Sequence, residues 1–131
     1  MDMNITFPGN KRVHAEYNGF VIETDQSADS GGDNSAPQPF DLFLASLGTC
    51  AGIYVLSFLQ QRGLPTEGAG LVMTTVDNPE TKLISKVLLD IKVPEGFPEK
   101  YRNAVIRAAE QCAVKRHLDS PPIIETTVSL G

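Results

Sequence analysis

One apolar stretch, residues 39–63, constrains the fold of this chain more than any other feature. Its sequence is PFDLFLASLGTCAGIYVLSFLQQRG, in which large apolar side chains recur at helical spacing and fill most of the remaining circumference. A helix that is apolar nearly all round belongs in a protein interior. Pro39 suits the start of such a helix, and Gly63 before Pro65 suits its end. We therefore expect a long helix at the centre of the core, with Cys50 buried near its middle.

A membrane-spanning helix is the competing interpretation of this stretch. Asp41 interrupts its front, polar residues close its end, and the apolar part between them is shorter than the roughly 20 residues that cross a bilayer. The first residues have neither the basic start nor the apolar run of a secretory signal. We therefore expect a cytoplasmic protein that does not enter a membrane.

Length and charge limit the organisation of the chain and its partners. A chain of 131 residues is sufficient for one core, which predicts a single domain over residues 1–131. The net charge of -5 repels phosphate backbones and anionic surfaces, so we expect no nucleic-acid partner. The chain has two cysteines, and in such a chain these are buried thiols, redox groups or metal ligands rather than a structural disulfide.

Strand patterns flank the central stretch on both sides. Residues 11–17 and 20–24 alternate apolar and polar side chains around Asn18-Gly19, a pair that favours a type I′ hairpin, and residues 4–7 extend this sheet. Residues 71–76 and 83–93 predict a second hairpin around a polar turn. Residues 26–38 have the composition of a loop, which is either the rim of a site or a solvated connector.

Two more elements are expected after the second hairpin. Apolar residues from Tyr101 to Cys112 recur at helical spacing opposite a charged face, which predicts one amphipathic helix with Cys112 on its inner side. Alternating apolar residues over 124–130 predict a last strand. The order of the elements indicates an α+β fold with antiparallel hairpins.

Each cysteine lies on the inner face of a predicted helix. One small core has to hold both faces, which allows the thiols to meet and to form a reversible disulfide, although buried cysteine also commonly acts as a small apolar residue. A thiol becomes a nucleophile only as thiolate, which a nearby cation favours. The candidate cations or bases are Arg12, His14 and His117. A zinc site and a cysteine hydrolase that uses one of these histidines remain open as alternatives.

The residues around both cysteines resemble the OsmC/Ohr family of organic hydroperoxide reductases. The similarity lies in residues 39–50, in Gly31-Gly32 before them and in residues 109–114 after them, and it spans nearly the whole chain. It implies an α+β fold in which two chains intertwine as a homodimer, with their antiparallel sheets wrapping a pair of central helices. Two sites would then lie at the dimer interface.

The resemblance also implies a mechanism. Cys50 matches the peroxidatic cysteine, whose thiolate attacks the O–O bond of an organic hydroperoxide, releases an alcohol and becomes a sulfenic acid. Cys112 matches the resolving cysteine, which condenses with that sulfenic acid to a disulfide. A dithiol reductant, either a lipoyl-bearing protein or a small thiol, would then restore both thiols. No metal and no organic cofactor are implied.

The chain departs from the family at two positions. The arginine that favours the thiolate matches Arg12, but the glutamate that holds it, directly after the proline, is here Phe40. The nearest acid is Asp41, and one step along a helix turns a side chain by about 100°. In this respect the chain is more similar to the OsmC-like branch, and Ala113 replaces the usual proline after the resolving cysteine. The alternative function is an OsmC-like protein that binds a small lipophilic ligand without efficient peroxide turnover.

Overall fold

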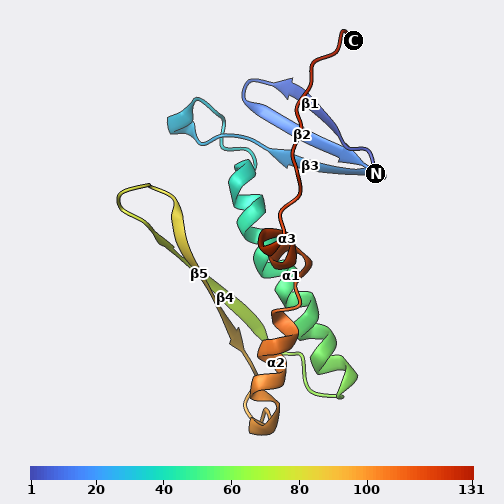
Figure 1. Ribbon diagram of the computed structural model, residues 1–131, viewed down its shortest axis with the longest axis vertical. Coiled ribbons are helices and arrows are strands. Elements are labelled where there is room, and N and C mark those ends of the chain that lie inside the picture. Colours follow the sequence, from blue (N-terminus) through green and yellow to red (C-terminus); the bar gives the residue numbers. More distant parts are fainter. The chain divides into compact units, whose positions relative to one another are not determined.

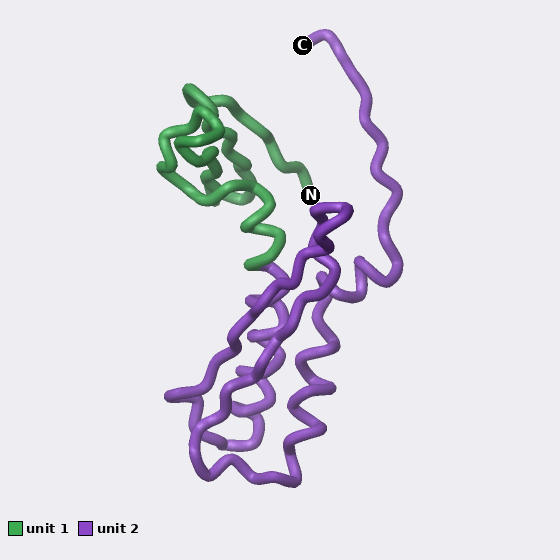
Figure 2. Tube along the Cα trace, turned by 90° about the vertical axis from the view of Figure 1, so that its left-hand side faces the viewer, with its two compact units in different colours: residues 1–45 green, residues 46–131 purple.

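The computed structural model describes all 131 residues, which form two compact units, residues 1–45 and 46–131 (Figure 2). The long helix α1, Pro39–Gln61, begins in the first unit and continues through the second (Figure 1). Three strands precede α1, and two strands and two short helices follow it. This order confirms the α+β class with antiparallel hairpins.

The first unit is built on a three-stranded antiparallel sheet. Strands β1 (Asn4–Gly9), β2 (Arg12–Tyr17) and β3 (Phe20–Thr24) lie in the order β1-β2-β3. Tyr17 pairs with Phe20 across the turn, and Asn18 and Gly19 have φ angles of 47° and 81°. A type I′ turn requires positive φ at both central residues, so the hairpin predicted from Asn18-Gly19 is confirmed.

The loop from β3 to α1, with the 3₁₀ turn η1 (Ala28–Ser30), is organised by the fully buried Asp25. The Asp25 carboxylate accepts hydrogen bonds from the Ser35 hydroxyl (2.6 Å) and from the backbone amides of Ser35 (3.0 Å), Gln26 (2.7 Å) and Asp33 (3.3 Å). These bonds, the Ser35 hydroxyl first, lower the pKa of Asp25 from 3.8 to about 2. The depressed pKa means that Asp25 stabilises the loop above about pH 4, a contribution lost as the pH falls toward 2.

Gly32 lets this loop fold back on itself. A Cβ atom at Gly32 would lie 2.1 Å from the carbonyl oxygen of Gln26, which no side chain can tolerate. The Gly32 amide donates to the Ser27 carbonyl (2.9 Å), and the Asn34 amide donates to the Gln26 carbonyl (3.0 Å). The loop therefore has a defined structure, although its composition alone suggested only a solvated connector or the rim of a site.

The second unit packs a β-hairpin and two short helices on α1. Strands β4 (Gly70–Asp77) and β5 (Ile84–Lys92) are antiparallel, with Leu71 opposite Ile91, and confirm the second predicted hairpin. In the turn between the two strands, the side-chain oxygen of Asn78 accepts hydrogen bonds from the backbone amides of Glu80 and Thr81. A 3₁₀ turn, η2 (Glu99–Tyr101), leads into helix α2 (Arg102–Ala109), and helix α3 (Ala113–Asp119) follows.

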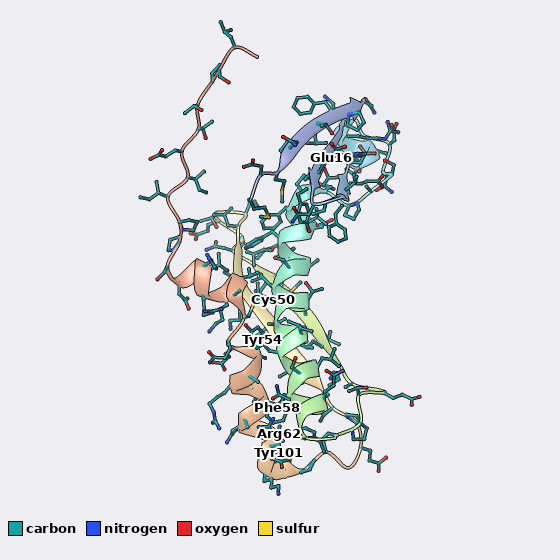
Figure 3. The ribbon with its side chains drawn as sticks, turned by 90° about the vertical axis from the view of Figure 1, so that its right-hand side faces the viewer. Glu16, Cys50, Tyr54, Phe58, Arg62 and Tyr101 are labelled. Atoms are coloured by element: carbon teal, nitrogen blue, oxygen red, sulfur yellow. The ribbon has the colours of Figure 1, made fainter.

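The core of this unit lies where α1 meets α2. Its buried members are Ala51, Val55, Phe58 and Leu59 of α1 and Val105 and Ala109 of α2, with Leu71 of β4 and Ile91 of β5 packed against them. At its end, the Arg62 guanidinium lies 3.6 Å from the centroid of the Phe58 ring and 5.4 Å from that of Tyr101 (Figure 3). This stacking closes the core with a cation–π contact.

The prediction that α1 is buried on all sides is wrong for this chain by itself. Only five residues of α1 are buried, while Ile53 is 53% and Leu56 is 38% exposed. The hairpin and α2 cover one side of the helix and leave the other apolar side open. Cys50 is accordingly half-buried rather than deep. By length and mean hydropathy (1.9) α1 could also cross a membrane, a test that core helices pass as well.

Two other predicted elements differ in the structure. The single amphipathic helix is interrupted, because α2 ends at Ala109 and α3 begins at Ala113. The last strand expected over 124–130 is absent: residues 121–131 have no regular structure, and Val128 is 96% exposed. Alternation gives a segment the pattern of a strand, but a strand also needs an edge to pair with, and this tail pairs with none in the chain.

Candidate active site

The two cysteines meet in the second unit. Cys50 lies on the side of α1 that faces the C-terminal helices (Figure 3). Cys50 is half-buried, whereas Cys112 is buried. Cys112 is the residue before α3, with an extended backbone (φ −50°, ψ 128°). Its thiol interacts with that of Cys50, which lowers the pKa of Cys50 and raises the pKa of Cys112, and the two form no disulfide. The structure thus brings together the two residues predicted as a reactive pair.

The pKa of the Cys50 thiol is lowered by its surroundings. The largest cause is a hydrogen bond from the backbone amide of Val114, and burial opposes it. Further hydrogen bonds from the Cys112 thiol and the Ala113 amide, and the charge of Arg116, act in the same direction as Val114. The two amides are available because the first N–H groups of a helix have no partner within it. The interruption before α3 therefore supplies the donors that favour the thiolate.

The pKa of Cys112 moves the opposite way. Burial is the largest cause that raises it, and the hydrogen bond and negative charge of Cys50 raise it further. The backbone amides of Lys115 and Val114 oppose this rise. The pKa values of the two thiols therefore move apart, that of Cys50 downward and that of Cys112 upward.

The amide of Ala113 gives a direct test of this arrangement. Proline has no N–H, so Ala113→Pro removes one donor to Cys50. Proline is favoured at the first helical position, and the extended backbone of Cys112 suits a residue before proline, so the fold should be kept. We expect the pKa of Cys50 to rise, measured as the pH dependence of its alkylation by iodoacetamide.

The matched control for this variant is Ala113→Ser, which also changes the side chain but keeps the amide. It should leave the alkylation profile of Cys50 near that of the unmodified chain. An unchanged profile in Ala113→Pro, with α3 intact by circular dichroism, would show that the Ala113 amide does not act on Cys50.

An apolar cavity of about 650 Å³ opens beside Cys112. Its walls come from β5, α2 and α3, together with Leu47 of α1, and they include Leu89, Ile91, Val105, Ile106 and Leu118. Charged side chains of both signs, such as Asp90, Arg102 and Lys115, also line it. The cavity can accommodate an apolar group next to one member of the thiol pair.

The other two predicted site residues lie in the first unit and do not pair with each other. The Arg12 guanidinium donates from Nη2 to the carboxylate of Asp33 (2.8 Å) and from Nε to the hydroxyl of Ser35 (3.3 Å). Asp41 lies exposed in the first turn of α1, and its carboxylate makes no hydrogen bond or ion pair. The acid that holds Arg12 is therefore Asp33, which sequence analysis did not single out.

His117 lies in the last turn of α3, where its ring contacts the helix backbone. His117 Nδ1 lies 2.6 Å from the carbonyl oxygen of Ala113, within its own helix. No group of three or more His, Cys, Asp or Glu side chains is placed to hold a metal ion.

The amides of Ala113 and Val114 were also missed by sequence analysis, because the break before α3 has neither a glycine nor a proline to mark it.

Several solved structures share this fold. A candidate osmotic stress induced and detoxification response protein from Psychrobacter arcticus is 22% identical, with a TM-score of 0.72 over 87% of this chain and 85% of that one. An organic hydroperoxide resistance protein, OsmC, from Legionella pneumophila is 17% identical, with a TM-score of 0.55 over 90% and 89% of the two chains. A candidate organic hydroperoxide resistance protein from Vibrio cholerae is 16% identical, with a TM-score of 0.55 over 92% and 86%.

Sequence comparison assigns the family. No curated protein matches the chain significantly. The family model for OsmC-like proteins matches residues 32–127, which include α1, both hairpin strands of the second unit and both cysteines. The match covers most of the chain and agrees with the fold and with the sequence resemblance around Cys50 and Cys112. The chain therefore belongs to the OsmC family.

Proposed function

We propose that this protein is a two-cysteine, thiol-dependent peroxidase that reduces organic hydroperoxides to alcohols. The observation that supports it best is that two free thiols meet at the start of α3, where the helix amides lower the pKa of Cys50 and burial raises that of Cys112. A peroxidatic cysteine has to react as a thiolate, whereas the resolving cysteine stays protonated until the sulfenic acid has formed. A pair of buried structural cysteines has no need of this asymmetry.

The reaction proceeds in three balanced steps. The Cys50 thiolate attacks the terminal oxygen of the hydroperoxide, the O–O bond breaks, and the alkoxide leaves and is protonated to the alcohol. The Cys112 sulfur then attacks the Cys50 sulfenic acid, which forms the disulfide and releases water. A dithiol reductant, such as a lipoyl-bearing protein or a small dithiol, reduces the disulfide by exchange and becomes oxidised itself.

The first step prepares Cys112 for the second. Burial and the negative charge of Cys50 both raise the pKa of Cys112 while Cys50 is a thiolate. The sulfenic acid is neutral, so its formation removes the part of the shift that comes from that charge. Cys112 therefore becomes easier to deprotonate when it has to attack.

An organic rather than an inorganic peroxide is the proposed substrate. Two structures with the same fold belong to proteins described as organic hydroperoxide resistance proteins, one of them a candidate. The apolar cavity beside Cys112 offers a place for the carbon chain of such a peroxide, which hydrogen peroxide lacks.

Stopped-flow oxidation of the reduced protein tests this proposal. We expect cumene hydroperoxide to oxidise Cys50 at least about tenfold faster than hydrogen peroxide, because burial of the apolar group adds more than about 1.4 kcal/mol. Peptide mass spectrometry should then find Cys50 and Cys112 linked. Thiols that persist in both peroxides would contradict the proposal.

Ligand binding without turnover is the second candidate function, and the cavity of about 650 Å³ favours it. In that case a lipophilic probe would bind to the reduced protein and raise its melting temperature, while peroxide left the thiols unchanged. The stopped-flow experiment separates the two functions, because a binding protein has no reason to form the disulfide.

We also propose a homodimer. The apolar side of α1 with Ile53 and Leu56 is open to solvent in the single chain. A symmetric partner is the common way to cover such a face.

A further inference from the structure

We propose that a groove between α1 and α2 is a binding site for a small organic anion, whose carboxylate or phosphate group is held by Arg62 and Arg107. The groove has a volume of about 640 Å³. It shares no lining residue with the apolar cavity beside Cys112. This site is therefore separate from the one proposed for the peroxide.

The charge of the groove is opposite to that of the whole chain. Two arginines line it, and no aspartate or glutamate does, although the chain has 16 acidic residues and a net charge of -5. A concave surface lined by charges of one sign raises the local concentration of ions of the other sign. The groove therefore attracts anions to a protein whose net charge repels them.

Neither arginine of the groove is neutralised within the chain. Arg102, on the same helix as Arg107, pairs with Glu99 at 3.3 Å. Arg62 and Arg107, in contrast, form no ion pair with any carboxylate of the chain. A guanidinium matches the geometry of a carboxylate or phosphate through two parallel N–H donors. Both charges are therefore available to a ligand.

Arg62 is ordered before any ligand binds. Its guanidinium lies 3.6 Å from the centroid of the Phe58 ring and 5.4 Å from that of Tyr101 (Figure 3). Its Nη1 also donates a hydrogen bond to the carbonyl oxygen of Phe58 at 3.4 Å. The residue is nonetheless exposed, so its other N–H groups are open to a ligand. An arginine that is already ordered loses less side-chain entropy on binding than a mobile one.

Neutral polar side chains line the rest of the groove. Tyr54, Ser57 and Gln61 come from α1, and Gln111 comes from the turn after α2. None of these four side chains makes a hydrogen bond within the chain. Their hydroxyl and amide groups can donate to the oxygen atoms of an anion beside the two arginines.

Isothermal titration calorimetry of the full chain tests the site. The ligands to be titrated are citrate and inorganic phosphate, in chloride buffers of equal ionic strength. We expect saturable binding of at least one of them: citrate alone identifies a carboxylate ligand, and phosphate alone a phosphate ligand. Arg107→Gln should weaken the binding on the order of tenfold, because it removes a charged hydrogen-bond donor. Arg107 has no ion pair in the chain, so this variant should fold.

Arg102→Gln is the matched control, because it removes the same charge from the same helix outside the groove. It should leave the affinity near that of the wild type. Proton–nitrogen correlation spectra locate the bound anion: the side-chain amide signals of Gln61 and Gln111 should move during the titration. The signal of Gln60, which does not line the groove, should stay in place.

Two results would overturn the inference. One is the absence of saturable binding for both citrate and phosphate. The other is an equal loss of affinity in Arg107→Gln and Arg102→Gln, which would show that only the overall charge matters. The proposed peroxidase is tested separately by oxidation with cumene hydroperoxide, and neither result bears on it.

Discussion

Cys50→Ser should abolish the reduction of organic hydroperoxides completely. Only a thiolate attacks the O–O bond at a useful rate, and the lowered pKa of Cys50 makes it the sole candidate of the pair, because Cys112 is buried with a raised pKa. Peroxide consumption by Cys50→Ser with excess dithiothreitol should fall to the rate of dithiothreitol alone.

Cys112→Ser should have a different outcome. Cys50 would still react once, but its sulfenic acid would find no partner thiol and would proceed to the sulfinic acid at higher peroxide. Mass spectrometry of the Cys50 peptide should show one and then two added oxygen atoms instead of the disulfide. A Cys112→Ser protein that cycles with a dithiol at the wild-type rate, without overoxidation, would show that Cys112 does not resolve the sulfenic acid.

Ile53→Glu should convert the proposed homodimer into monomers or prevent it from folding. Ile53 is 53% exposed on the open side of α1, and an unpaired carboxylate buried there by a partner chain would cost several kcal/mol. Light scattering at micromolar concentration should give the mass of two chains for the wild type and of one chain for the variant.

Asn103→Glu is the control for this change. Asn103 is exposed and polar on α2, so the same added charge should leave the dimer intact there. Leu56→Glu should repeat the effect of Ile53→Glu from the next turn of the same side. A wild-type protein that is already monomeric with its fold intact would contradict the dimer.

Local chemistry explains which elements were predictable from the sequence. The Asn18-Gly19 hairpin needs only two residues that accept positive φ, and α1 needs only a long apolar run, so both patterns determine their structures. The break before Cys112 has no such signal, because the residues around it all favour a helix or tolerate one. The break results from tertiary packing rather than from local sequence. Sequence analysis therefore missed both the break and the amides of Ala113 and Val114 that act on Cys50.

The same distinction applies to the candidate site. The meeting of the two cysteines could be predicted because both were expected to face one small core, although Cys112 lies at the break before α3 and not on a helix face. The family resemblance added which cysteine would react first. The partner of Arg12 could not, because it depends on how a loop of more than ten residues folds over Asp25. The central-helix acid was the natural candidate from sequence order, whereas Asp33 is brought to Arg12 only by that folded loop.

The buried Asp25 also affects how this loop can change over evolutionary time. The conformation of this loop is held by hydrogen bonds from a few backbone amides to the buried carboxylate of Asp25. The solvent-facing side chains of the loop therefore contribute little to it. We therefore expect a substitution or an attached label at Ala28 or Asp29 to leave the loop conformation and the contact between Asp33 and Arg12 unchanged. Asp25, Gly32 and Ser35 have no such freedom, since Ser35 donates to the Asp25 carboxylate and a Cβ atom at Gly32 would strike the Gln26 carbonyl.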